Sequence, residues 1–279
     1  MDLSGKTVIL TGATGGIGAP LCRALVEAGA QVLAVGRNHR RLNQLQRDLP
    51  IGRVNCVMAD LATTEGREHL VNLAHQLRPT PSVLVIGHAQ SAFGIFADQD
   101  AASLEALLQT NLVGTTLLIH GLMPLLRAQG QASVAVIGST FGSLAFPGFA
   151  AYSATKFALR GLVEALAREH ADTALKFQYL SPRATHTSFN SPAVNALNAE
   201  LKVACDEPEA VARQLVDALI RGDLRRQLGW PEKLFARLNG AFPGLVDRSL
   251  RSKLQIIRRH AKGQKTSSQE ATTHEALLR

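Results

Sequence analysis

In the stretch TVILTGATGGIG, residues 7–18, a β-branched run leads directly into a loop with four glycines. Thr7–Leu10 is typical of a buried strand, and the pattern after the glycines predicts a helix to about Ala28. Glycines at such a turn let the backbone approach a phosphate at the helix N-terminus, where free N–H groups favour negative charge. The stretch predicts nucleotide binding, with an ordinary glycine-rich connection as the alternative.

Strand and helix patterns alternate through the following 200 or so residues, as in βαβ units of a parallel sheet. Further strands are expected at residues 31–36, 53–59, 82–86, 133–138 and 176–180. The run Val83–Ile86 is apolar throughout, which is typical of strands covered on both faces. We expect a doubly wound, Rossmann-like α/β domain over residues 1–230, a basic amphipathic helical extension at 231–260 and a disordered tail at 261–279.

Composition argues against several classes of protein. No run of about 18 apolar residues predicts a transmembrane helix, and the N-terminus lacks the basic and apolar regions of a secretory signal. The three cysteines contain no C-x-x-C pair, and the nine histidines form no metal-binding pattern. We therefore expect a cytoplasmic protein without a disulfide framework or a metal site.

The net charge of +8 is concentrated in one segment, residues 221–262, where 11 basic residues face 3 acidic ones. Apolar residues such as Leu234, Phe235 and Leu238 recur there at helical spacing, and Trp230 precedes them. This pattern predicts either peripheral contact with an anionic membrane surface through 231–260 or a helix packed across a substrate mouth or a subunit interface. No nucleic-acid-binding motif accompanies the charge, so nucleic acid is not expected as a partner.

A second stretch, AAYSATKFAL at residues 150–159, places Tyr152 and Lys156 four residues apart. On a helix this spacing puts both side chains on one face. A nearby positive charge favours the phenolate and lowers the pKa of the phenol, so the tyrosine can act as an acid and base near neutral pH. A packed tyrosine beside a solvated lysine is the alternative interpretation.

Together with the glycine pattern, this pair resembles the short-chain dehydrogenase/reductase family, in its single-domain branch with a Y-x-x-x-K active site; the resemblance covers about residues 5–225. It implies an oxidoreductase that transfers hydride between a nicotinamide cofactor and a carbonyl or secondary alcohol, and a homodimer or homotetramer. The catalytic residues that it implies are Asn111, Ser139, Tyr152 and Lys156. The cofactor contacts that it implies are Gly12, Thr14, Gly16, Ile17, Gly18, Asp60, Leu61, Ala89, Tyr152, Lys156, Pro182 and Thr187.

The resemblance also implies a role for each catalytic residue. Tyr152 would give its proton to the carbonyl oxygen, to which Ser139 would donate a hydrogen bond. Lys156 would lower the pKa of Tyr152 and hold the nicotinamide ribose. Asn111 would position a water molecule that relays protons towards Lys156.

Two positions depart from the family pattern. Gly87-His88-Ala89-Gln90 stands where Asn-Asn-Ala-Gly is usual, so the Gln90 side chain is expected where the family keeps bare backbone against the cofactor ribose. Pro182 is followed by Arg183 in place of glycine. We expect Arg183 either in solvent or at a phosphate or an acidic substrate group.

The charge after the second strand predicts the cofactor. An acidic residue there holds the ribose 2′-hydroxyl of NAD, whereas an arginine accommodates the 2′-phosphate of NADP. Arg37 occupies this position, with Arg40 and Arg41 close by, and a planar guanidinium suits a phosphate. We predict NADP, with a solvated arginine as the alternative.

Apolar residues dominate the segments expected around the substrate. Residues 141–149 contain three phenylalanines, and residues 188–202 contain Phe189, Val194 and Leu197. We expect an NADP(H)-dependent reductase of a lipid-like, aromatic or steroid-like ketone; simple loop packing also explains these residues. Two other functions stay open: a non-catalytic nucleotide-binding regulatory or scaffold member of the family, and a reductase of carrier-bound 3-oxoacyl chains.

Overall fold

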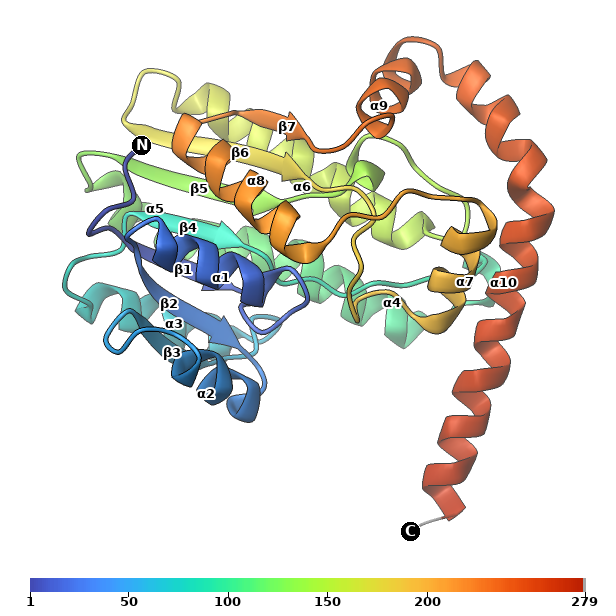
Figure 1. The fold of residues 1–279 in the computed structure, drawn as a ribbon, viewed down its shortest axis with the longest axis horizontal. Coiled ribbons are helices and arrows are strands. Elements are labelled where there is room, and N and C mark those ends of the chain that lie inside the picture. Colours follow the sequence, from blue (N-terminus) through green and yellow to red (C-terminus); the bar gives the residue numbers. More distant parts are fainter. Residues whose placement is uncertain (278–279) are drawn as a thin grey trace.

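Seven parallel strands form one sheet between two layers of helices (Figure 1). The computed structural model describes the backbone of residues 1–277 and the side chains of residues 1–262. The strands are β1 (Thr7–Thr11), β2 (Gln31–Gly36), β3 (Val54–Met58), β4 (Val83–Ile86), β5 (Ala132–Ile137), β6 (Leu175–Ser181) and β7 (Arg225–Gln227). Their order, β3-β2-β1-β4-β5-β6-β7, confirms the predicted doubly wound, Rossmann-like α/β sheet.

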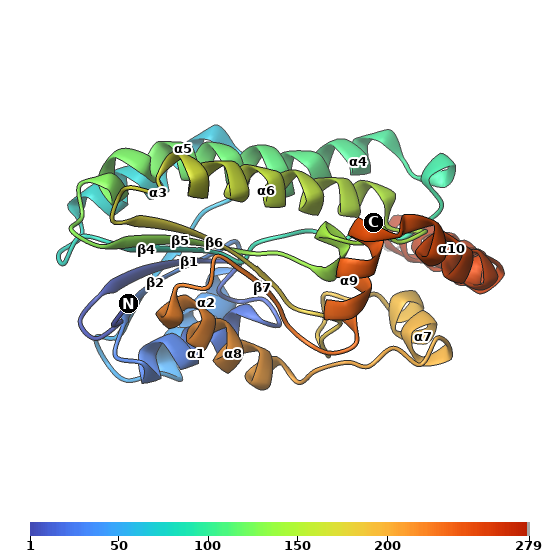
Figure 2. The same cartoon turned by 90° about the horizontal axis from the view of Figure 1, so that it is seen from above.

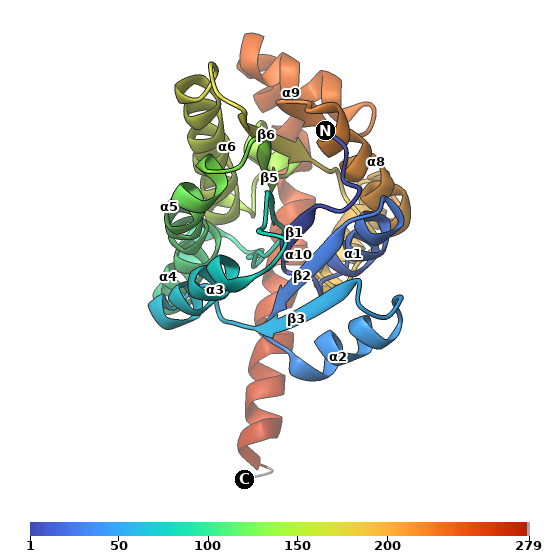
Figure 3. The same ribbon diagram turned by 90° about the vertical axis from the view of Figure 1, so that its left-hand side faces the viewer.

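Ten α-helices cover the sheet and its carboxyl edge within residues 1–277. They are α1 (Gly18–Glu27), α2 (His39–Arg47), α3 (Thr64–Gln76), α4 (Ala101–Leu108), α5 (Gly114–Arg127), α6 (Ala150–Glu169), α7 (Pro192–Glu200), α8 (Pro208–Arg221), α9 (Glu232–Ala241) and α10 (Pro243–Leu277). Short turns of 3₁₀ or π helix occupy Phe96–Asp98, Gln109–Val113 and Thr140–Gly142. Helices α1, α2 and α8 lie on one face of the sheet, and α3 to α6 lie on the other (Figures 2 and 3).

The central strands are buried on both faces, which explains their unbroken apolar sequences. Strands β1, β4 and β5 are buried at every position. Successive side chains point to opposite faces, so Leu10 joins the apolar cluster under α1 and α8, whereas Ile9 joins the cluster under α5 and α6. Because a fully buried leucine or isoleucine contributes about 1.5–3 kcal/mol, these two clusters hold both helix layers on the sheet.

The segment Ala101–Arg127 consists of α4, a π-helical turn and α5, and by length and composition it is apolar enough to span a membrane. The sequence analysis identified no such segment. In the structure, α5 packs against α3 and buries residues such as Leu118, Ile119 and Leu122 in the cluster beneath it. The segment is therefore accounted for as a core helix of the domain.

Two elements were not predicted from the sequence. Strand β7 is a three-residue edge strand, Arg-Arg-Gln, that pairs with β6 and has no apolar residue to mark it. Helix α7 lies within residues 188–202, which were expected to surround the substrate without an assigned helix. Its start is capped by Ser191, whose side chain accepts a hydrogen bond from the backbone N–H of Val194, and Pro192 occupies its first turn.

The C-terminal extension forms two helices, α9 and α10, which meet at Phe242, and α10 packs beside α7 (Figure 1). Pro243 begins α10, a position where proline loses no helical hydrogen bond. The inner side of α10 packs on the domain, with Ile257 and Ala261 in one apolar cluster with Phe149 and Leu197. Helix α10 continues to Leu277, through residues that were predicted to be disordered, and residues 278–279 lie outside the described part.

Candidate active site

A cavity of about 1020 Å³ lies at the carboxyl ends of the strands. In doubly wound sheets, ligands bind in this crevice, where the strand order reverses between β1 and β4. The loops after β1, β2 and β3 line one half of the cavity, and α7, α9 and α10 contribute to the other half. Every site residue predicted from the sequence lines this cavity except Asn111.

The start of α1 is built to receive an anion. Ile17 precedes the helix, no side chain caps its free N–H groups, and no acidic residue lies in its first turn. Gly16, Ile17 and Gly18 line the cavity. Unpaired N–H groups and the positive end of the helix dipole together favour a phosphate at this point.

Two glycines of this loop are required by close backbone contacts. Gly12 has a φ of +67°, and a Cβ there would lie 2.7 Å from the carbonyl carbon of Gly87 at the end of β4. A Cβ on Gly18 would lie 2.0 Å from the carbonyl oxygen of Gly12. The loop therefore packs on β4 and on itself only because both positions lack a side chain.

Arginines line the cavity beside the end of β2. Arg37 and Arg41 are exposed and line the cavity, and neither forms an ion pair within residues 1–262. The neighbouring Arg40 does not line the cavity. Asp60, after β3, also lines this half and accepts a hydrogen bond from the backbone N–H of Ala62 at 3.0 Å. Two free guanidinium groups suit a phosphate carried on the ribose of a dinucleotide.

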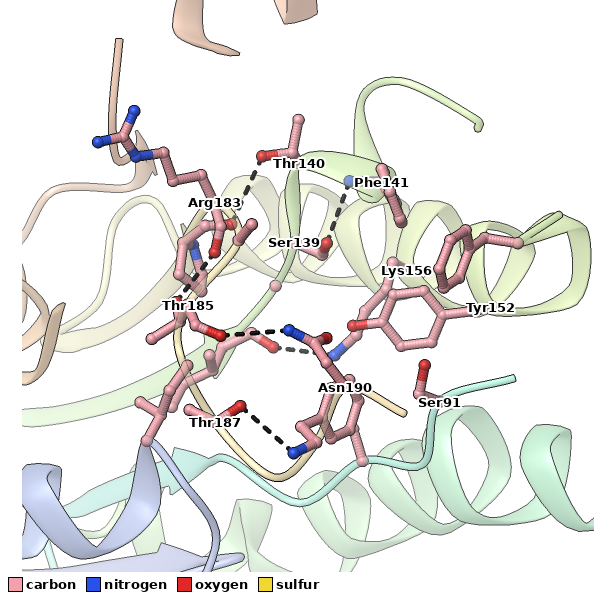
Figure 4. A pocket seen from close by; sticks show the side chains of 18 of the residues that line it. Ser91, Ser139, Thr140, Phe141, Tyr152, Lys156, Arg183, Thr185, Thr187 and Asn190 are labelled. Atoms are coloured by element: carbon pink, nitrogen blue, oxygen red, sulfur yellow. Dashed lines mark hydrogen bonds between the residues drawn. The ribbon is translucent and has the colours of Figure 1, made fainter. Parts of the chain in front are cut away.

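Ser139, Tyr152 and Lys156 come together between β5 and α6 (Figure 4). Helix α6 places Tyr152 and Lys156 on one face, and the Lys156 Nζ lies 5.6 Å from the centre of the Tyr152 ring. The same Nζ donates a hydrogen bond to the Ile137 carbonyl at 3.1 Å. Tyr152 is 7% exposed and Lys156 is 3% exposed, so both polar groups work in a site largely shielded from water.

Burial controls the protonation of this pair. It raises the pKa of Tyr152 to about 12, although a hydrogen bond with Ser139 acts in the opposite direction. It lowers the pKa of Lys156 to about 8. The Tyr152 pKa therefore lies above its ordinary value rather than near neutrality, because removal from water penalises the phenolate and dominates the shift. That Lys156 acts to lower this pKa stays a prediction.

Asn111 lies behind the cavity wall, in the π-helical turn before α5. Its Oδ1 accepts a hydrogen bond from the Gln90 N–H at 2.7 Å, and its Nδ2 donates one to the Gln90 carbonyl at 2.9 Å. Gln90 itself does not line the cavity, so the prediction that its side chain lies against the cofactor is wrong. Asn111 fixes the backbone after β4, while its contact with a water molecule stays a prediction.

His88 joins three elements of the core and was not singled out from the sequence. Its Nδ1 lies 2.8 Å from the Thr11 hydroxyl at the end of β1, and its Nε2 lies 3.3 Å from the Thr115 hydroxyl in α5. Removal from water, with the Lys156 charge as a further cause, lowers the pKa of His88 to about 4. The ring is therefore neutral near pH 7 and ties β1, β4 and α5 together by hydrogen bonds.

Tyr179 supports helix α6 and was also missed. Its hydroxyl donates a hydrogen bond to the Lys156 carbonyl at 2.9 Å. A Cβ on Gly138 would lie 2.3 Å from this ring, and a Cβ on Gly142 would lie 2.1 Å from its hydroxyl. No local pattern links these positions, because they meet only once β5, β6 and α6 have packed.

Arg183 lines the cavity and is held in ion pairs, so the expectation that it points into solvent is wrong, while its contact with a phosphate or an acidic substrate group stays a prediction. Its guanidinium pairs with Asp206 at 2.6 Å and with Glu232 at 3.4 Å, and donates a hydrogen bond to the Trp230 carbonyl at 2.9 Å. The two carboxylates raise the pKa of Arg183 further. Arg183 thereby ties the start of α9 to the loop between α7 and α8, beside the cavity.

The half of the cavity around Tyr152 is mainly apolar. Its aromatic and aliphatic lining residues are Phe141, Leu144, Phe146, Phe149, Phe189, Val194, Leu197, Leu201, Phe235, Leu238, Leu245, Val246 and Leu250. The Phe141 ring centre lies 6.3 Å from that of Tyr152, and the Phe189 ring centre lies 6.1 Å from it. Ser91 and Asn190 add polar groups close to Tyr152 (Figure 4), and neither was predicted.

Comparison with known proteins gives consistent results. A family model described as short chain dehydrogenase matches residues 6–198. The mouse 3-ketodihydrosphingosine reductase is 27% identical over 242 residues, which cover 82% of this chain and 73% of that protein.

Solved structures with the same fold include a short-chain dehydrogenase from Streptomyces avermitilis. It is 28% identical, with a TM-score of 0.76 over 92% of this chain and 99% of that chain. The Pseudomonas aeruginosa RhlG/NADP complex is 25% identical, with a TM-score of 0.72 over 80% of this chain and 93% of that chain.

We expect His88→Asn to make the protein less sensitive to acid. His88 binds a proton below about pH 6.5 in the unfolded chain but only near pH 4 in the folded chain, because its pKa is lowered. The free energy of unfolding therefore falls as the pH drops from 6.5 to 4. Between pH 7 and pH 5 the wild type should lose about 2 kcal/mol more unfolding free energy than the variant. Urea unfolding at both pH values measures this difference, with His120→Asn, at an exposed histidine of α5, as the matched control. Equal acid sensitivity of the His88→Asn variant and the wild type would contradict it.

We expect Lys156→Met to stabilise the fold at pH 7 while removing the catalytic ammonium. Lys156 keeps its proton up to about pH 10.5 in the unfolded chain but only up to about pH 8 in the folded chain. Burial of the charged ammonium therefore destabilises the wild type fully below pH 8 and progressively less as the pH rises above 8. The variant should gain about 3 kcal/mol at pH 7 and lack the extra rise in stability between pH 8 and 10.5. Unfolding measured at pH 7 and 9.5 tests this, with Lys176→Met at an exposed site as the control. A variant that is less stable at pH 7 would show that the bond to Ile137 outweighs the cost of burial.

Proposed function

The chain belongs to the short-chain dehydrogenase family, and from this premise we propose that it is an NADP(H)-dependent reductase of apolar ketones. The observation that carries the proposal is the meeting of Ser139, Tyr152 and Lys156 with the uncapped start of α1 in one cavity. A non-catalytic relative would not need a buried tyrosine and lysine, whose burial destabilises the charged forms. The reaction class is hydride transfer to a carbonyl carbon.

The nicotinamide, when bound, supplies the hydride. Tyr152 holds the proton for the carbonyl oxygen, and its pKa of about 12 keeps the phenol protonated at neutral pH. Ser139 presents a hydroxyl to the same oxygen. Lys156, held by the Ile137 carbonyl, is mostly charged at pH 7 and stabilises the phenolate that remains after proton transfer. A phenol that resists ionisation is suited to reduction, which starts from the protonated form.

The cofactor is proposed from the charge at the end of β2. Arg37 and Arg41 are free to contact a 2′-phosphate, and the start of α1 is free to contact the pyrophosphate. NAD would leave both guanidinium groups without an anion. The RhlG/NADP complex, which shares the fold, is consistent with this choice.

The substrate class is proposed from the apolar half of the cavity. Phe141, Phe189 and Phe235 come from three separate segments and face the same space as Tyr152. Burial of alkyl or aromatic groups against such a surface is favourable by about 25 cal/mol per Å². The likeness to a protein named for reducing 3-ketodihydrosphingosine supports a lipid-like ketone.

We also propose that the protein is a homodimer or homotetramer. Four large apolar side chains are exposed on α4 to α6 and the turn between them: Leu108, Val113, Leu117 and Phe157, at 38–46%. An exposed apolar patch of this kind is typical of a protein interface. These residues lie on the helices that cover one face of the sheet (Figure 2).

Arg37→Asp should change the cofactor preference. We expect NADPH to bind the wild type at least about tenfold more tightly than NADH, and the variant to lose this preference because a carboxylate repels the 2′-phosphate. Nicotinamide fluorescence during titration measures both affinities. Arg40→Asp is the matched control, since Arg40 is a neighbouring exposed arginine that does not line the cavity. Equal losses in both variants would mean that general charge, rather than contact, sets the preference.

Tyr152→Phe should reduce turnover of an aromatic test ketone by about 10²–10⁴-fold, because the proton donor is lost. NADPH affinity should stay within about twofold, since the ring and its packing remain. Steady-state kinetics and the same fluorescence titration separate the two effects. Turnover that persists at the wild-type level would show that another group donates the proton.

A further inference from the structure

The junction of α9 and α10 exposes large apolar side chains in a folded part of the chain. We call residues 230–253 the elbow; α9 and α10 meet in it at Phe242 (Figure 1). Its exposed apolar residues are Trp230 at 66%, Leu234 at 41%, Phe235 at 43%, Phe242 at 60% and Leu245 at 62%. The inner side of the same helices is covered, since Val246 is 6% exposed. The exposed residues therefore form a separate outer surface.

The elbow is also strongly basic. Its basic side chains are Lys233, Arg237, Arg248, Arg251 and Lys253, and none of them forms an ion pair within residues 1–262. The acidic residues are Glu232, which is paired with Arg183, and the exposed Asp247. Unpaired positive charge is thus interleaved with exposed apolar side chains over the same two helices.

The elbow surrounds an opening of the cavity. Phe235 and Leu245 line the cavity and are exposed at the same time. Leu234 and Phe242 are exposed without lining it. Phe235 and Leu245 therefore give an apolar connection between the outer surface of the elbow and the space around Tyr152, beside the polar lining residues Glu232, Ser249 and Lys253.

The domain holds the elbow in place. Arg183 pairs with Glu232 at the start of α9, and the Asn239 side chain donates a hydrogen bond to the Ser143 carbonyl at 2.9 Å. On α10, Ile257 is fully buried in the cluster that contains Phe149. These contacts fix α9 and α10 on their inner sides, so the outer apolar residues have no nearby surface of the domain to cover them.

We propose that the elbow is a docking surface for an anionic lipid bilayer, which places the mouth of the cavity at the membrane. Aromatic and aliphatic side chains enter the interfacial region of a bilayer, while lysine and arginine meet the lipid phosphates. A second copy of the chain would bring the same positive charge to the contact and be repelled. An acidic protein would match the charge but would leave Leu234 and Phe242 unexplained on the side away from the cavity. The proposal goes beyond the reductase activity, because it concerns where the protein binds.

Vesicle co-sedimentation of the full chain tests the proposal. Binding is expected to phosphatidylcholine vesicles that contain phosphatidylglycerol, to fall steeply with salt, and to be weak for phosphatidylcholine alone. The double variants Leu234→Ser/Phe242→Ser and Arg237→Glu/Arg248→Glu should each bind about tenfold more weakly or worse. These four residues do not line the cavity, so turnover of a water-soluble ketone should not change.

Matched controls carry the same substitutions on other surfaces. Ile51→Ser removes a fully exposed apolar side chain, and Arg47→Glu/Arg213→Glu reverses two exposed charges, so both should bind vesicles like the wild type. Tyr152→Phe should also bind normally, which separates docking from catalysis. The proposal is overturned by the absence of binding to anionic vesicles at low salt, or by equal losses in the control variants. It is also overturned if Leu234→Ser/Phe242→Ser lowers the mass of the chain in solution without vesicles, since the elbow would then join two copies.

Discussion

The contact between Gly12 and Gly87 is the constraint on which the rest of the site depends. Two backbones approach here so closely that a single Cβ would lie 2.7 Å from the opposing carbonyl carbon. The contact seats the loop after β1 against the end of β4, at the point where the strand order reverses. It directs the start of α1 into the cavity and brings the Thr11 hydroxyl within 2.8 Å of His88. The start of α1, which is suited to a phosphate, and the cavity wall at His88 thus both depend on the contact between Gly12 and Gly87.

The proposed catalytic groups, Tyr152 and Lys156, owe their pKa shifts to burial rather than to direct pairing. Tyr152 and Lys156 follow from one helix, but the pKa of Tyr152 depends on burial and on a hydrogen bond with Ser139, which follows β5. Ile137 from β5 and Tyr179 from β6 form hydrogen bonds with Lys156. Burial shifts both groups towards their neutral forms, which destabilises the lysine but keeps the tyrosine ready to donate a proton. The stability lost at this site is offset by the fully buried strands around it.

The extension after β7 changes what the cavity can hold. Arg183 replaces the glycine that resemblance to the family leads one to expect, and its ion pairs with Asp206 and Glu232 bring α9 beside the cavity. Phe235 and Leu245 then add apolar surface to a space that would otherwise open directly to water. The Arg183 guanidinium therefore links the cavity that contains Tyr152 to helix α9.

The sequence by itself determined the doubly wound sheet, the glycine loop and the shared face of Tyr152 and Lys156, because each depends on short-range spacing. The sheet follows from the alternation of strand and helix patterns, and the loop from glycines at a turn. The shared face follows from a separation of four residues on a helix. Only the tertiary structure decided the partners of Arg183 and the position of Gln90, as well as the strand β7, whose Arg-Arg-Gln sequence carries no pattern. It also decided that burial raises the pKa of Tyr152. These features arise from groups that are distant in sequence and meet on packing, and desolvation and ion pairing depend on that final arrangement rather than on local spacing.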